Sequence, residues 1–233
     1  MAEKLYGLNK TTLIDFPGKV ASTIFTRGCN LRCPYCHNPD FVSGTDVPDL
    51  FTWGEITDYL KKRSHLLGGV CITGGEPLLH DDLPDNISDI HGLGLEVKID
   101  TNGTLPDKLR HLKVDYIAMD IKTSLEDYVR LGFTGDDSEL AGRITESIRI
   151  VKESGIPHHF RTTVVPGFVS IKVIKDILKL VEGEGTYVLQ GFRPGNTLDP
   201  AYSKMLPPEP ALLEEMQAMF SEKNIDCALR YNN

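Results

Sequence analysis

Short β-like runs alternate with segments of helical periodicity along the whole chain, and this alternation limits the fold more than any other feature of the sequence. Repeated strand–helix alternation is typical of a parallel sheet covered by helices, so the pattern predicts an α/β fold. On alternation alone, a doubly wound sheet and a partial (β/α) barrel both remain open. The predicted strands are residues 20–26, 70–73, 95–100, 116–122, 159–165 and 186–190.

Helix signals fall between these runs. Thr52 followed by Glu55 forms the sequence pattern of a capping box, and an apolar stripe follows it. A later stripe is ended by Gly155 and Pro157, and another by Gly183. We interpret these stripes, and that of a last helix from Pro210, as core packing. Their members are Ile56, Tyr59 and Leu60; Leu140, Ile144, Ile148 and Val151; Ile174, Ile177, Leu178 and Val181; and Leu212, Met216, Met219 and Phe220.

The two faces of the predicted strands differ sharply, because side chains alternate with period two along a strand. One face is apolar and suits packing against helices: Val97, Ile99, Ile117, Met119, Ile121, Phe160, Val164 and Leu189. The other is mainly charged or polar: Lys98, Asp100, Ala118, Asp120, Lys122, Arg161, Thr163 and Gln190. A closed barrel would bury these charges at a cost of several kcal/mol each. We therefore expect a partial, laterally open (β/α)6 TIM-like barrel with a polar cavity; a solvated rim of strand ends is the alternative.

No linker or charge block divides the 233 residues, so we expect one domain over 1–233, with a core of about 18–195 and a C-terminal helix and short strand in about 207–230. The net charge of −8 argues against a nucleic-acid partner, which would require a basic face. No apolar run approaches the ~20 residues that span a bilayer, and residues 1–5 show no signal-peptide stretch. These features predict no membrane partner and a cytoplasmic location.

Three of the five cysteines, Cys29, Cys33 and Cys36, fall within eight residues directly after the first predicted strand. An odd number of cysteines in one tight group favours a metal or cluster site over disulfides. Three thiolates can hold an iron–sulfur cluster that leaves one iron open to a ligand. A zinc site with His37 as fourth ligand is the alternative, disfavoured because His37 adjoins Cys36 and no second cysteine pair exists. Cys71 and Cys227 lie in apolar runs and are predicted to be buried without function.

The sequence Cys29-x-x-x-Cys33-x-Tyr35-Cys36 resembles the signature of the radical S-adenosylmethionine (SAM) superfamily, in which an aromatic residue precedes the last cysteine. The resemblance implies a [4Fe-4S] cluster on the three cysteines, SAM as second cofactor and the open barrel of that superfamily. Gly74, Gly75 and Glu76 are similar to the segment that binds the SAM ammonium group. An ordinary strand-to-helix turn would show the same residues.

Other segments resemble those that line the SAM site in this family. A carboxylate at Asp100 or Asp120 would bind ribose hydroxyls, or hold a monovalent cation beside the SAM carboxylate. Arg161 would bind a carboxylate or peptide carbonyls, or form a salt bridge to either carboxylate. Gln190 would meet adenine or substrate. The same resemblance assigns His37 to SAM placement or redox tuning, and Asn102 and Lys122 to the lining of the site.

Residues 12–18 and 36–39 resemble the branch that activates anaerobic ribonucleotide reductases. This implies reductive cleavage of SAM to a 5′-deoxyadenosyl radical, which abstracts hydrogen from a glycine of a glycyl radical enzyme. The implied partners are that enzyme and a one-electron donor such as flavodoxin or ferredoxin. A radical SAM enzyme acting on a small molecule, for example in deazapurine synthesis, and a zinc-binding module remain as alternatives.

Overall fold

The computed structural model describes residues 4–43, 47, 49–183 and 185–231. The expectation that residues 1–5 contain no signal peptide therefore falls partly outside the described residues. Within these residues, nine strands form one sheet in the order β3-β1-β2-β4-β5-β6-β7-β8-β9. The strands are β1 (Leu5–Thr12), β2 (Ala21–Thr26), β3 (Phe51–Thr52), β4 (Gly69–Gly74), β5 (Glu96–Thr101), β6 (Tyr116–Asp120), β7 (His158–Val164), β8 (Thr186–Gly191) and β9 (Asp226–Arg230).

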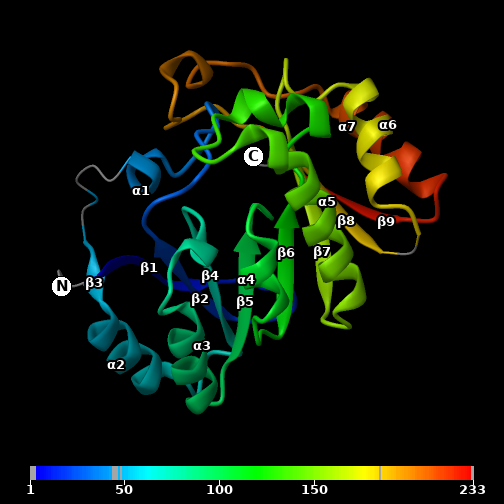
Figure 1. Cartoon of the computed structure of the whole chain (residues 1–233). Helices are drawn as coiled ribbons and strands as arrows, with labels where there is room; N and C mark the ends of the chain where they lie inside the picture. Colours follow the sequence, from blue (N-terminus) through cyan, green and yellow to red (C-terminus); the bar gives the residue numbers. More distant parts are fainter. Residues whose placement is uncertain (1–3, 44–46, 48, 184, 232–233) are drawn as a thin grey trace.

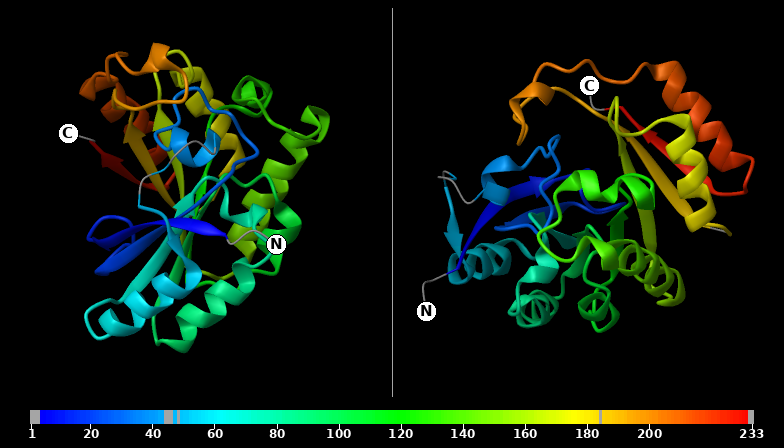
Figure 2. Two further views of the ribbon diagram at one scale, coloured as in Figure 1. Left: turned by 90° about the vertical axis from the view of Figure 1, so that its left-hand side faces the viewer. Right: turned by 45° about the horizontal axis from the view of Figure 1, so that its top comes forward.

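The sheet is curved but not closed, and the helices α2 to α7 lie along its outer side (Figures 1 and 2). From β2 through β9 every neighbouring pair is parallel. The open side lies between β9 and the β1–β3 end, which confirms the laterally open barrel. The helices are α1 (Pro39–Ser43), α2 (Trp53–Arg63), α3 (Leu83–Gly92), α4 (Pro106–Arg110), α5 (Asp137–Glu153), α6 (Ile171–Leu180) and α7 (Pro210–Ser221), with 3-10 turns at Pro77–Leu79, Leu125–Leu131 and Pro200–Tyr202.

The outer face of the parallel strands forms the hydrophobic core together with the helices. All eight apolar residues predicted for that face are buried in one continuous cluster. The expected helix signals also hold: Thr52 and Glu55 make both hydrogen bonds of a capping box at the start of α2, and the α5 stripe is buried. No helix in the described residues is long and apolar enough to cross a membrane.

Two sequence expectations were wrong in part. The sheet is not wholly parallel, because β1 pairs antiparallel with β2 and with β3. In α7 the buried residues are Leu213, Met216 and Phe220, whereas Leu212 and Met219 are only partly buried. The core-facing stripe of this helix therefore begins one residue later than the apolar pattern indicated.

Two aromatic side chains and a histidine pack together at the end of the barrel away from the cysteines. Phe16 is buried there, and its ring centroid lies 6.0 Å from that of Tyr116. The Tyr116 hydroxyl lies 3.0 Å from His159 Nδ1. His159 is 2% exposed, and its Nε2 has no hydrogen-bond partner in the described residues. Burial, with the nearby charges of Lys98 and Arg161, lowers the pKa of His159 to about 3.

This buried histidine predicts a loss of stability in acid. Between pH 6.5 and about 3 the unfolded chain binds a proton at His159 that the folded chain does not, so the free energy of unfolding falls as the pH falls. One such group contributes at most ~1.4 kcal/mol per pH unit. We expect urea titrations at pH 7, 6 and 5 to show a smaller loss in His159→Gln than in the wild type. Equal slopes in the two proteins would contradict the buried neutral imidazole.

Candidate active site

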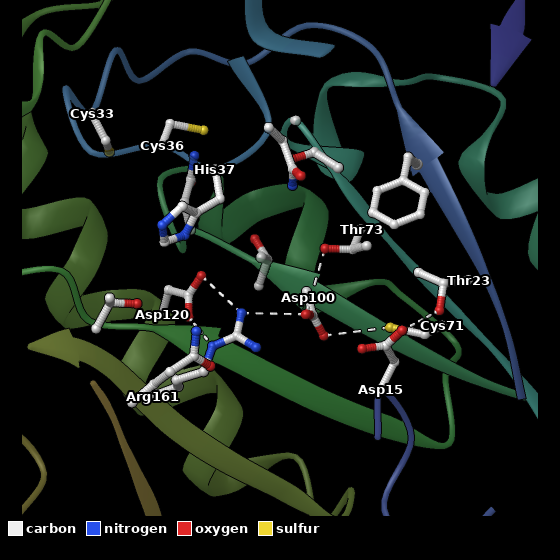
Figure 3. A pocket seen from close by; sticks show the side chains of 18 of the residues that line it. Asp15, Thr23, Cys33, Cys36, His37, Cys71, Thr73, Asp100, Asp120 and Arg161 are labelled. Carbon is white, nitrogen blue, oxygen red and sulfur yellow. Dashed lines mark hydrogen bonds and ion pairs between the residues drawn. The ribbon is translucent and has the colours of Figure 1, made fainter. Parts of the chain in front are cut away.

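All fourteen site residues predicted from the sequence line one pocket of about 890 Å³ inside the barrel. Figure 3 shows Cys33, Cys36 and His37 on one side of this pocket and Asp100, Asp120 and Arg161 on its floor. The residues come from the loop after β2, from the strands β4, β5, β6, β7 and β8, and from the positions that directly follow some of these strands. They are Cys29, Cys33, Tyr35, Cys36, His37, Gly74, Gly75, Glu76, Asp100, Asn102, Asp120, Lys122, Arg161 and Gln190.

The cysteine loop is held in place by backbone hydrogen bonds from distant segments. The Arg32 amide donates to Leu131 O over 2.7 Å. The amides of Leu198 and Asp199 donate to Cys36 O and Pro34 O over 3.2 and 2.8 Å. The loop conformation is thus set by contacts with segments beyond β6 and β8.

The three thiols of this loop form no disulfide, and Cys33 is 8% exposed. Burial raises the pKa of all three, that of Cys33 to about 12. The Leu31 amide donates to Cys29 Sγ over 3.4 Å. Thiols on one short loop at a pocket wall are a donor set suited to an iron–sulfur cluster, whose binding would displace their protons.

The zinc alternative finds no fourth ligand in His37. His37 Nε2 lies 2.9 Å from Arg193 O, and its ring stacks on Phe192 at 5.4 Å. His37 is therefore engaged by the segment after β8 and is not placed as a fourth ligand beside the three thiols.

The glycine turn after β4 lies against the cysteine loop. The Glu76 amide donates to Gly28 O over 2.9 Å, and Gly75 N donates to Thr26 O over 2.9 Å. A Cβ on Gly75 would lie 1.8 Å from Gly28 O, so only glycine fits here without displacing the backbone. The turn and the residue before Cys29 therefore act as one unit.

A Gly75→Ala substitution is expected to push the two loops apart. Overpacking of this kind costs about 1–3 kcal/mol or more, and we expect the iron content after reconstitution to fall with it. The matched control is Gly142→Ala in α5, where an added Cβ meets nothing within 4 Å and should stabilise the protein by about 0.5–1 kcal/mol. Unfolding midpoints and iron analysis measure both effects, and unchanged values in Gly75→Ala would contradict this close packing.

Glu76 is 1% exposed, and its carboxylate binds the protein rather than facing the pocket freely. It accepts hydrogen bonds from Thr101 Oγ1, Asn102 N and Leu78 N over 2.8, 2.7 and 3.1 Å. Burial raises its pKa to about 7 although these donors oppose the shift. Glu76 therefore connects the glycine turn to the end of β5, where we had expected it to meet an ammonium group.

Asn102 connects the same region to the cysteine loop. Its Nδ2 donates to Asn30 Oδ1 over 2.9 Å and lies 3.8 Å from Cys29 Sγ. Its Oδ1 accepts from the Thr104 amide over 3.0 Å. These hydrogen bonds fix the Asn102 side chain beside Cys29, which a residue of an ordinary turn would not require.

The floor of the pocket is a buried ion network. Arg161 Nε lies 2.6 Å from Asp120 Oδ1, and Arg161 Nη2 lies 3.3 Å from Asp100 Oδ2. Lys122 also pairs with Asp120, over 2.7 Å, and Lys98 pairs with Asp100. Burial opposes ionisation of Asp120, but Arg161 and Lys122 hold its pKa well below the usual range. Of the roles open to Arg161, the structure shows the salt bridge, and to both carboxylates.

The monovalent cation expected beside the SAM carboxylate stays a prediction, and the carboxylates that would hold it are already paired with basic side chains. Three cations (Lys98, Lys122 and Arg161) already face the two carboxylates, Asp100 and Asp120. Within this network the positive charges outnumber the carboxylates by one, which favours an anionic ligand, although the Asp15 side chain also lines the pocket.

Sequence reasoning missed several pocket residues. Cys71, interpreted as an apolar core residue, lies on the polar inner face, with its Sγ 3.5 Å from Lys98 Nζ and 3.7 Å from Asp100 Oδ1. Because Cys71 stands between Val70 and Ile72 in one strand, the period of two already indicated that its side chain points to the opposite face from theirs. The residues 13–17 of the β1–β2 loop and Arg230 of β9 also line the pocket. Residues 13–17 lie in the segment 12–18 whose resemblance to the activating branch we noted without assigning it to the pocket, whereas no motif marks Arg230, which reaches the site through the pairing of β9 with β8.

Comparison with known proteins agrees with this geometry. The family model for the radical SAM superfamily matches residues 23–181. A protein of Methanocaldococcus jannaschii, provisionally named glycyl-radical enzyme activating enzyme MJ1227, is 32% identical over 230 residues, covering 94% of this chain and 92% of that protein. The pyruvate formate-lyase-activating enzyme of Clostridium pasteurianum is 28% identical over 174 residues, 70% of this chain and 69% of its own.

Two further matches are more partial. A 7-carboxy-7-deazaguanine synthase of Methanothermobacter thermautotrophicus is 33% identical over 156 residues, 61% of each chain. The structure of Streptococcus suis SuiB bound to S-adenosylmethionine has a TM-score of 0.63 at 15% identity, covering 88% of this chain and 48% of that one. At this identity the structural match supports the fold only.

Proposed function

Because this chain belongs to the radical SAM superfamily, we propose that it activates a glycyl radical enzyme, with an anaerobic ribonucleotide reductase as the partner. In this proposal Cys29, Cys33 and Cys36 hold the [4Fe-4S] cluster, and residues 1–233 act as one domain. When bound, the cluster and SAM supply a 5′-deoxyadenosyl radical, at the expense of one electron from a donor such as flavodoxin or ferredoxin.

The open side of the barrel is the observation that carries the proposal. The pocket extends from the cysteine loop to both borders of the opening, since residues 13–17 on one border and Leu229, Arg230 and Tyr231 on the other line it. A loop of another protein can enter there and bring a glycine Cα to the pocket. Relatives named as activating enzymes, one of them over 92% of its length, support the same activity.

The residues of this chain would position the second cofactor. The backbone carbonyls of Gly74 and Gly75 would accept from the SAM ammonium group, while the excess positive charge at Lys122 and Arg161 would attract its carboxylate. Asn102 and Glu76 would orient the two loops that meet there. His37 would fix the mouth of the cysteine loop through Arg193 O, and Tyr35, packed on Phe168, would shield the cluster from water.

Transfer of deuterium tests the proposal directly. The reconstituted protein is incubated without oxygen with SAM, dithionite and a ribonucleotide reductase carrying glycine deuterated at Cα. We expect a stable organic radical on the reductase by electron paramagnetic resonance, and deuterium in the 5′-deoxyadenosine by mass spectrometry. SAM cleavage that leaves neither a radical on the reductase nor deuterium in the nucleoside would refute this partner.

A second candidate is synthesis of a deazapurine, favoured by the match to a 7-carboxy-7-deazaguanine synthase and by the positive pocket floor. This activity requires the same cluster and SAM cleavage but no protein radical. Formation of 7-carboxy-7-deazaguanine in an anaerobic extract supplied with the protein, without a glycyl radical, would favour it.

A further inference from the structure

Several polar side chains on one side of the pocket form no hydrogen bond with the part of the protein that the structure describes. On β2 and β4 to β6, the polar side chains that line it have partners: Thr23 donates to Asp15, Thr73 reaches Asp100, and the carboxylates are in the ion network. On β7 to β9 only Arg161 belongs to that ion network, and the other polar side chains of these strands that line the pocket differ. Thr163, Gln190 and Arg230 line the pocket, yet their side chains form no hydrogen bond or ion pair within the described residues.

These three side chains form a row across the sheet. Thr163 is in register with Gln190, and Gln190 is in register with Arg230. Neighbouring strands lie ~4.8 Å apart, so the row runs ~10 Å from the interior to β9, the strand beside the opening. All three residues are half-buried, which leaves their polar groups accessible from the pocket.

The chemistry of the row matches a peptide backbone. Gln190 offers a donor and an acceptor, as a peptide group does, Thr163 offers a hydroxyl, and Arg230 offers donors for a carbonyl oxygen. An extended chain advances ~3.3 Å per residue, so a ~10 Å row spans about three residues. We propose that the Thr163–Gln190–Arg230 row binds the backbone of the substrate polypeptide on either side of the reacting glycine. This inference rests on the proposed function and specifies its substrate-binding residues.

The opposite border of the opening agrees with a polypeptide substrate. Leu13 and Ile14 line the pocket and are 73% and 76% exposed, an unusual position for two adjacent large apolar side chains. Apolar side chains of an entering loop can cover them, while the backbone of that loop faces the row on β7 to β9. A small polar substrate held inside the barrel would leave both of them in water.

A blocked peptide tests the row without knowledge of the partner. The probe is acetyl-Ala-Ala-Gly-Ala-Ala-amide with two deuterium atoms on the glycine Cα, added to the reconstituted full chain with SAM and dithionite. The readout is the deuterium content of 5′-deoxyadenosine as a function of peptide concentration. For Arg230→Ala and Gln190→Ala we expect KM for the peptide to rise about tenfold, and kcat to change less.

Two comparisons separate binding from a general loss of structure. Arg230→Lys keeps a charged donor and should recover part of the affinity. A peptide with N-methylated alanines lacks backbone donors, so its KM with the wild type should be raised, as KM for the unmodified peptide is in Gln190→Ala. Arg63→Ala, at an exposed arginine in the last turn of α2, should match the wild type. Unchanged KM in both row variants would overturn the inference. Absence of deuterium transfer from the peptide would also overturn it, while a radical formed on the whole reductase would leave the proposed function standing.

Discussion

Replacement of Cys33 by alanine is expected to eliminate SAM cleavage while preserving the fold. Cys33 is the most buried of the three loop cysteines, and two thiolates hold an iron–sulfur cluster poorly. The loop itself is fixed by backbone bonds at Leu131, Leu198 and Asp199, none of which requires the Cys33 side chain. Anaerobic reconstitution should therefore give little bound iron, no cluster signal after dithionite, and at least a thousandfold less 5′-deoxyadenosine, with a normal circular dichroism spectrum.

Cys227→Ala provides the matched control. This cysteine is equally buried, at 6%, but packs in the core rather than on the pocket. Its loss should cost about 1 kcal/mol of stability and leave iron content and SAM cleavage at wild-type values. Full SAM cleavage by Cys33→Ala, or loss of iron in Cys227→Ala, would contradict the assignment of the cluster to the loop.

The parallel strands and their two faces could be predicted from the sequence because both signals are local. Val97 and Ile99 alternate with Lys98 and Asp100 within one short run, and the first pair packs in the hydrophobic core while the second pair joins the ion network of the pocket. The cysteine spacing is equally local. These features depend on the spacing of residues along the chain and not on which strands become neighbours in the sheet.

The remaining features depend on contacts between distant segments. β1 is a strand because it pairs with β2, although three of its eight residues, Asn9, Lys10 and Thr11, are polar and exposed. Arg230 reaches the pocket because β9 pairs with β8 at Gln190. Two of the three partners of the Glu76 carboxylate, Thr101 and Asn102, lie 25 and 26 residues away in the sequence, so no local pattern showed that this carboxylate would bind within the protein.

The ion network on the pocket floor predicts that removal of an acidic side chain costs more stability than removal of a basic one. In the wild type three cations face two carboxylates. Arg161→Met leaves two of each, and each carboxylate keeps one lysine. Asp120→Asn leaves three cations with Asp100 as the one remaining carboxylate of the network, and the half-buried Lys122 loses the anionic partner that it has there. An unpaired buried charge is the costly state in such networks.

We therefore expect Asp120→Asn to lower the free energy of unfolding by about 3–5 kcal/mol, and Arg161→Met by about 2 kcal/mol. Urea titration at pH 7 measures both, and Asp176→Asn, which removes an exposed pair with Lys179, should leave the midpoint unchanged. An anion in the pocket should reduce the difference, because it neutralises the excess positive charge that the asparagine variant enlarges. A larger loss for Arg161→Met than for Asp120→Asn would mean that the carboxylates, and not the cations, are the groups in excess on the floor, and the attraction proposed for the SAM carboxylate would lose its basis.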